Sequence, residues 1–163
     1  MPGSIRRGPK GRTGWLERAK AARQAARPHG YVAVLGLETY DTARLVNRIE
    51  AGLPMSALSH FIRNTALPSS TAARLVGLTA RTLARRKLEK HLRADESDRL
   101  VRAARLYAQV VELFEGDEGQ ARRWITAPQP ALGGEIPVRY ASTEVGARAV
   151  EELIGRLENG IPS

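Results

Sequence analysis

The sequence predicts an all-α fold made of two successive helical units, and three observations support this prediction. From residue 42 onward, apolar residues recur at helical spacing between capping residues and glycines. Two short helical stretches meet at Gly77 with the spacing of a helix-turn-helix. Charge also divides the chain, because residues 42–93 carry ten basic and two acidic side chains whereas residues 94–163 carry eight and twelve.

Composition excludes several classes of protein. The 163 residues include no cysteine, which rules out disulfides, thiolate metal sites and cysteine nucleophiles, and a cytoplasmic location is expected. No apolar run approaches the roughly 20 residues of a membrane span, so no membrane partner is expected. The basic N-terminus lacks the apolar core of a secretory signal. The net charge of +9 favours a polyanionic partner for the basic part, and solvated faces without a partner are the alternative.

Residues 1–40 are expected to be a basic, partly disordered extension. Residues 1–12 are rich in Gly, Pro and Arg and have no apolar periodicity. Residues 14–30 contain helix formers up to Pro28, as in a short basic helix or a tail that orders only on a partner. Residues 30–40 contain an apolar patch, and periodicity alone does not decide between a short strand and an apolar clip.

Two helices open the basic unit, which we place at residues 41–94. The first begins with Asp41 or Thr42 as its N-cap and stops at Gly52. The second has Pro54 in its first turn and apolar residues on one face.

The segment STAARLVGLTARTLARRK, residues 70–87, predicts the helix-turn-helix. Gly77 suits the left-handed conformation of the tight turn, and Thr79 can cap the second helix. That helix carries four cations within nine residues, and arginine suits both guanine and phosphate. The candidate DNA-binding residues are Thr79, Arg81, Thr82, Arg85, Arg86 and Lys87.

An ordinary corner between two helices of a basic protein has the same spacing and remains the alternative. Arg86 also stands where many such motifs keep a buried apolar residue. The sequence offers Leu88 as the residue that replaces it in the core.

The second unit, residues 95–163, is expected to be a small helical domain. It begins with a long helix that starts within residues 95–97 and ends at Gly116. The apolar stripe of this helix includes Leu100, Ala104 and Val110. A short helix follows, and its Trp124 is expected to pack into the core. The final helix is expected to open with Ser142 or Thr143, to carry Val145 on its apolar side and to end before Gly160.

The segment RRWITAPQPALGGEIP, residues 122–137, predicts a stiff loop between helices. Three prolines lock its backbone, Leu132 gives it an apolar anchor, and Gly133 and Gly134 allow a turn that a Cβ would forbid. Such a loop loses little entropy on binding, which suits a docking surface. A purely structural connector is an equal alternative. Arg122 and Arg123 are expected to point outward.

The C-terminal segment RLENGIPS is expected to end the last helix near Asn159, with Gly160 in a left-handed cap. Ile161, Pro162 and Ser163 would then project beyond the helix. They offer one apolar side chain, a stiff proline and a chain-end carboxylate. A frayed terminus is the alternative.

Two parts of the chain resemble the Xre/MbcA/ParS antitoxin family. The helix-turn-helix segment is similar to the Xre-like motif of that family. The last 50 residues or so resemble its C-terminal toxin-binding domain through an ordered series of positions: Phe114, Gly116, Ala121, Trp124, Pro128, Leu132, Gly133, Gly134, Pro137, Thr143, Gly146, Val150 and Gly160.

The resemblance implies a type II antitoxin. Its partner would be a RES-domain toxin that consumes NAD, either by degrading it or by transferring ADP-ribose. The antitoxin would cover the toxin's active-site cleft, and the basic half would bind operator DNA and repress the operon. A homodimer is expected. The residues implied for toxin binding are Arg122, Arg123, Leu132, Gly133, Gly134, Asn159, Gly160, Ile161, Pro162 and Ser163.

Other classes of function have less support. The three histidines, His29, His60 and His91, lack metal-ligand spacing, and no glycine-rich phosphate loop follows a strand. Neither an enzyme activity nor a metal or cofactor is therefore expected. The main alternative is a stand-alone helix-turn-helix regulator whose C-terminal half only dimerises.

Overall fold

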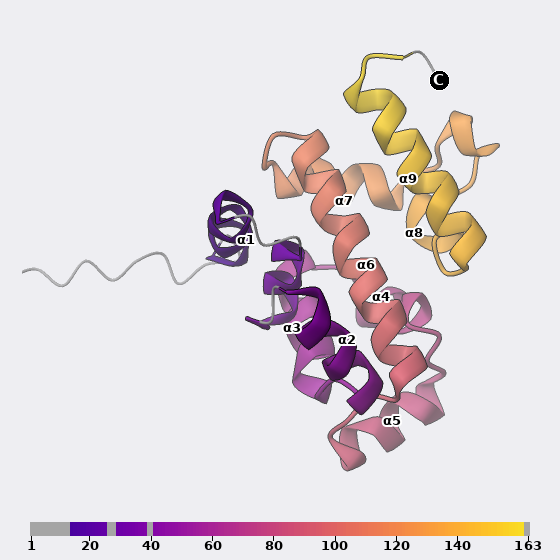
Figure 1. Ribbon diagram of the computed structural model, residues 1–163. Helices are drawn as coiled ribbons and strands as arrows, with labels where there is room; N and C mark the ends of the chain where they lie inside the picture. Colours follow the sequence, from indigo (N-terminus) through magenta and orange to yellow (C-terminus); the bar gives the residue numbers. More distant parts are fainter. Residues whose placement is uncertain (1–13, 26–28, 39–40, 162–163) are drawn as a thin grey trace, which may run out of the picture.

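The computed structural model in Figure 1 describes residues 14–25, 29–38 and 41–161. These residues form helices and two isolated bridges and contain no strand, so the prediction of an all-α fold is confirmed. None of the helices within them combines the length and apolar character that crossing a membrane requires.

Helix α6 (Ala94–Leu113) runs through the middle of the molecule (Figure 1). Its predicted apolar stripe is buried, with Leu100, Ala104 and Val110 fully covered. Helices from both halves of the chain pack against it: α2 (Thr42–Ala51), α3 (Met55–Thr65), α4 (Ser69–Leu75), α7 (Glu118–Thr126) and α9 (Glu144–Glu158). The two units therefore share one helix, and the boundary at residues 94 and 95 remains an interpretation.

The described part of the N-terminal region belongs to the core. Helix α1 (Gly14–Gln24) packs on η1 (Gly30–Leu35), a 3₁₀ helix whose valines are fully buried. The apolar patch is therefore a buried clip and not a strand. Trp15 is 1% exposed, and its ring lies 6.0 Å from that of Tyr107 in α6. The expected disorder falls on residues 1–12, which lie outside the described residues.

Helix starts follow the predicted capping residues closely. Asp41 accepts the N–H of Arg44 at the start of α2, and Thr143 accepts the N–H of Gly146 at the start of α9. Helix α6 begins at Ala94, one residue before the predicted range, with Arg93 as its N-cap.

The segment before α9 contains more helix than the sequence predicts. It includes η2 (Pro130–Leu132) and α8 (Pro137–Tyr140), a single turn that begins at Pro137. The chain then bends so tightly that Gly146 lies against the backbone of Tyr140. Val145, assigned to the apolar side of the last helix, is 79% exposed instead.

Two glycines of α9 test this packing. A Cβ added at Gly146 would lie 1.8 Å from the carbonyl oxygen of Tyr140, whereas one added at Gly155 meets nothing within 4 Å. Gly146→Ala should lower the free energy of unfolding by about 1–3 kcal/mol, because the backbone must move. Gly155→Ala should raise it by about 0.5–1 kcal/mol, because alanine favours a helix more than glycine does. Thermal unfolding measures both, and equal melting temperatures would contradict the close approach.

Candidate functional site

The turn of the helix-turn-helix is fixed by backbone and side-chain contacts. Gly77 adopts the left-handed conformation at φ +73°, as the sequence predicts. The N–H of Leu78 donates to the carbonyl of Ala73 at 2.8 Å, and Arg99 of α6 donates to the carbonyl of Val76 at 3.3 Å. The second helix, α5 (Ala80–Glu89), therefore leaves α4 in one defined direction.

The N-terminus of α5 is capped as predicted. The Thr79 hydroxyl accepts the N–H of Thr82 at 3.1 Å. Arg81, Arg85 and Lys87 are exposed on the helix, while Thr82 is half-buried. In Figure 1, α5 lies at one end of the molecule, where a large partner can reach it.

The prediction that Arg86 belongs to the exposed face is wrong. Arg86 is only 2% exposed, and Leu88, expected to replace it in the core, is 85% exposed. The reason is a partner that the helical pattern does not reveal. Glu96 of α6 is itself buried beneath α5, and its carboxylate requires a cation.

The Arg86–Glu96 contact is a bidentate ion pair, in which the guanidinium fork donates to both carboxylate oxygens. Arg86 Nε donates to Glu96 Oε2 at 2.8 Å and Nη2 donates to Oε1 at 3.0 Å, while Nη1 donates to Glu89 Oε2 at 2.7 Å. The hydrogen bond to Glu96 raises the pKa of Arg86. Burial would raise the pKa of Glu96, but hydrogen bonds from Arg86 and the Arg93 N–H hold it below its usual value. Both groups stay charged, and Arg86 is engaged within the protein.

The proline-rich loop is closed by its own backbone. Gln129 N–H donates to the carbonyl of Glu135 at 3.0 Å, and Gly134 N–H donates to the carbonyl of Gln129 at 3.0 Å. Leu132 is buried, as an apolar anchor should be. Gly133 and Gly134 have φ of +67° and +85° and stand exposed at the tip.

The two arginines before the loop do not both point outward. Arg123 is exposed, but Arg122 is half-buried and donates to the carbonyl of Thr65 in α3 at 3.4 Å. Arg122 therefore links α7 to the basic unit. Trp124 is half-buried rather than fully buried, with its ring 6.5 Å from that of Phe114.

The C-terminal segment has the predicted cap. Helix α9 ends at Glu158, and Gly160 is left-handed at φ +65°. The Asn159 amide donates to the carbonyl of Gly155 at 2.7 Å, so its donor serves the helix end. Ile161 is 52% exposed. Pro162 and Ser163, which were expected to project beyond the helix, lie outside the described residues.

The structure does not gather the candidate residues in one place. Helix α5 and the C-terminal end lie at opposite ends of the molecule in Figure 1. Glu96 was not identified from the sequence. The signal was the position of Arg86, because an arginine at a normally buried position needs a carboxylate partner. Among the residues that the structure describes, no group of three or more His, Cys, Asp or Glu side chains is placed to hold a metal ion.

A helix-turn-helix whose second helix carries exposed arginines is typical of DNA-binding proteins, and here it is joined to a second helical unit. Residues 44–105 match the antitoxin Xre-like helix-turn-helix domain. Residues 109–160 match the antitoxin Xre/MbcA/ParS C-terminal toxin-binding domain.

Three relatives are each described as antitoxin Xre. The protein of Yersinia enterocolitica serotype O:8 / biotype 1B is 33% identical over 128 residues, 78% of this chain and 86% of the relative. That of Photorhabdus laumondii subsp. laumondii is 34% identical over 116 residues, 71% and 78% of the two chains. That of Pseudomonas putida is 36% identical over 72 residues, 44% and 45%. The chain belongs to the Xre family of type II antitoxins.

The observed orientation of α5 can be checked by two leucine substitutions. Leu78 is 6% exposed and Leu88 is 85% exposed. Leu78→Ala should lower the free energy of unfolding by about 2–5 kcal/mol. Leu88→Ala should change it by no more than about 0.5 kcal/mol, since no buried contact is lost. Urea denaturation measures both. A large loss at Leu88 would mean that α5 is rotated relative to this structure.

Proposed function

We propose that this chain neutralises a RES-domain toxin that consumes NAD, by degradation or by ADP-ribosyl transfer, and represses its own operon by binding operator DNA. The observation that carries the proposal is the pairing of the two family matches on one chain. The RES partner follows from the resemblance of the C-terminal series of glycines, prolines and Trp124 to the toxin-binding domain of that family.

DNA binding is assigned to the outer face of α5. Arg81 and Arg85 are four residues apart and exposed, which puts them on one side of the helix. Arginines in this arrangement can each grip a guanine or a phosphate, and Lys87 adds charge at the helix end. Thr79 and Thr82 lie at the helix N-terminus, where backbone N–H groups favour a phosphate. Arg86 is no longer part of this set.

A homodimer fits this mode of binding. Helix-turn-helix proteins commonly read two half-sites about one helical turn of DNA apart, with one recognition helix in each. Light scattering of the purified chain determines the oligomeric state. A protein that stays monomeric on its DNA would contradict the dimer.

Toxin binding is assigned to the closed loop and the C-terminal segment. The loop tip at Gly133 and Gly134 is exposed above the buried Leu132, so it can contact a partner without losing its anchor. The 3₁₀ turn η2 that carries Leu132 also packs on α9. Ile161 projects beyond that helix and offers an apolar side chain to a cleft.

The alternative is a stand-alone regulator whose C-terminal half only dimerises. Affinity purification from the native host separates the two. An antitoxin co-purifies with a stoichiometric partner that consumes NAD when released, whereas a simple regulator co-purifies only with its DNA.

Arginine substitutions on α5 test the DNA interface. Arg81→Ala and Arg85→Ala should each cost about 1–3 kcal/mol of binding free energy per lost base contact and relax operator specificity. Arg139→Ala in α8 removes the same charge from another exposed site and is the matched control. Mobility shifts at fixed salt, on a duplex from the promoter region of the operon, measure all three. Unchanged affinity in both α5 variants would show that this helix does not contact the bases of the operator.

Changes at the C-terminal segment test toxin neutralisation. Deleting residues 161–163 keeps Gly160 and its hydrogen bond to Leu157, loses the one from the Ile161 N–H to the Arg156 carbonyl, and should impair neutralisation while preserving folding and DNA binding. Ile161→Asp should have the same effect, because it puts a charge on an apolar contact. Val46→Asp is the control, since Val46 is similarly exposed, at 45% against 52% for Ile161. Growth and cellular NAD during toxin co-expression report the outcome. Full protection by both C-terminal variants would assign neutralisation to the loop alone.

A further inference from the structure

Helix α5 is unusual in how it is held to the protein. Its only fully buried residue is Arg86. Leu83 packs against the core but is only half-buried, and Leu88 faces away from it. A recognition helix normally rests on an apolar stripe, and this one has hardly any. The contact that fixes α5 along its length is therefore largely polar.

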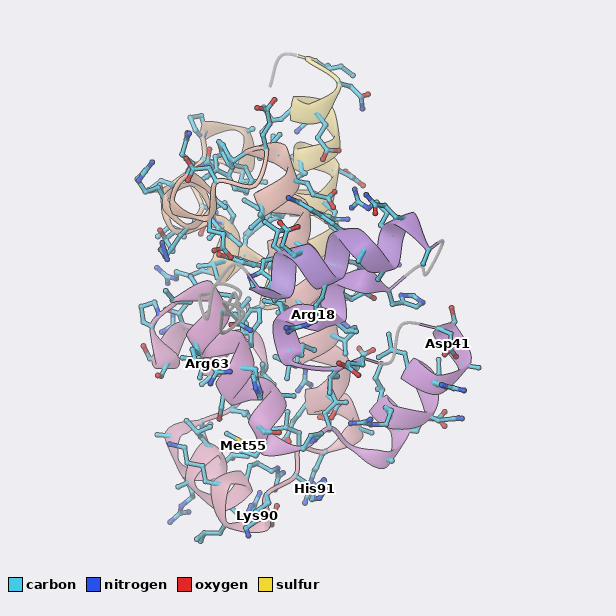
Figure 2. All side chains as sticks on the ribbon, turned by 90° about the vertical axis from the view of Figure 1, so that its left-hand side faces the viewer. Arg18, Asp41, Met55, Arg63, Lys90 and His91 are labelled. Carbon is cyan, nitrogen blue, oxygen red and sulfur yellow. The ribbon has the colours of Figure 1, made fainter. Side chains whose placement is uncertain are left out.

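The two ends of α5 are held by other contacts. Thr79 caps the N-terminus. At the C-terminal end, Lys90 is left-handed at φ +63°, and its carbonyl accepts the N–H of Met55 at 2.9 Å. His91 forms an isolated bridge with Pro54. Figure 2 shows Lys90 and His91 close to Met55. These contacts fix where the helix starts and stops, but a helix held at its ends can still roll about its axis.

The Arg86–Glu96 ion pair restricts the rotation of α5 about its axis, which the contacts at its ends do not. Glu96 lies in the first turn of α6, and its Oε2 also accepts the N–H of Arg93 at 2.8 Å, which orients the carboxylate. The planar guanidinium of Arg86 meets it with two parallel hydrogen bonds. Such a fork is directional, whereas an apolar contact tolerates sliding and rotation. Each residue step around a helix is about 100°, so a modest roll changes which side chains face outward.

We propose that Arg86 is a positioning residue for DNA recognition: its fork on Glu96 sets the roll of α5, and so aims Arg81 and Arg85 at the base edges. The proposal rests on the operator binding proposed above. It assigns specificity to a side chain that touches no DNA. Arg86 adds nothing to the exposed charge, so its loss affects discrimination between sequences more than general affinity for DNA.

Three variants separate positioning from simple stability. Arg86→Lys keeps the charge but replaces the fork by a single-point contact. The double variant Arg86→Met/Glu96→Met removes the pair without leaving a lone buried charge, and such replacements are often neutral or stabilising. Glu89→Gln is the matched control. It changes the outer, half-exposed partner of Arg86, which also lies 4.0 Å from Arg85 Nε, and leaves the fork on Glu96 intact. Because it removes a negative charge beside Arg85, affinity for both duplexes should rise together and their ratio should stay the same.

The first measurement is the ratio of dissociation constants for a promoter duplex and a random duplex of equal length, at one salt concentration. For Arg86→Lys and the double variant the ratio should shrink by about tenfold, the size of one lost bidentate base contact. Affinity for the random duplex should change less than about twofold, because the exposed cations are unchanged. Glu89→Gln should keep the wild-type ratio. A wild-type ratio in both fork variants would overturn the proposal.

The second measurement is amide hydrogen exchange without DNA. In the fork variants, α5 amides should exchange faster than in the wild type, while α9 amides keep their protection. Equal loss of protection in both helices would show a general stability effect and overturn positioning. Should the wild type itself not prefer the promoter duplex, operator binding fails, and the role of Arg86 in recognition fails with it. Unchanged α5 exchange in both variants would instead show that the fork does not hold the helix.

Discussion

The first turn of α6 holds the helix-turn-helix half of the molecule in place. Glu96 binds Arg86 of α5 and the N–H of Arg93. The neighbouring Ser97 is fully buried, and its hydroxyl accepts the N–H of Leu53, 2.8 Å away in the segment that joins α2 to α3. Two adjacent polar side chains thus connect three segments through directional bonds. Buried polar groups are costly unless satisfied, so this turn is stable only when all of its partners are in place.

Helix α6 also contacts the other half of the molecule. Twenty residues of α-helix span about 30 Å, long enough to separate two large binding partners. Further along α6, Arg105 donates to Glu151 of α9 at 2.8 Å, and the ring of Tyr107 packs against those of Trp15 and Phe61. Within the part of the chain that the structure describes, the buried apolar residues form one cluster. The proposed DNA and toxin surfaces, which lie at opposite ends of the molecule, are therefore built on one shared helix.

Local rules explain what the sequence predicted well. The caps at Asp41, Thr79 and Thr143 and the left-handed Gly77 and Gly160 each depend on a few adjacent residues. The burial of Arg86 and the exposure of Leu88 could not be predicted in this way, because they depend on the carboxylate of Glu96 in another helix. Arg122 is similar, since the carbonyl that it binds belongs to α3, 57 residues earlier. The apolar patch at residues 30–35 was too short for periodicity to decide its conformation, and packing made it a 3₁₀ helix.

That 3₁₀ helix also shows why the region outside both family matches belongs to the fold. The carbonyls of Ala33 and Val34 accept hydrogen bonds from Arg18 and Asn64, so this buried turn leaves neither of them unsatisfied. Gly30 lies so close to α1 that a Cβ there would come within 2.7 Å of a backbone oxygen. Trp15 connects α1 to the second half of the chain, because its ring N–H donates to the side chain of Glu118 in α7 at 2.7 Å. Residues 14–24 and 30–35 thus cover apolar surface of α3 and α6, and the two matched domains share a core that this region completes.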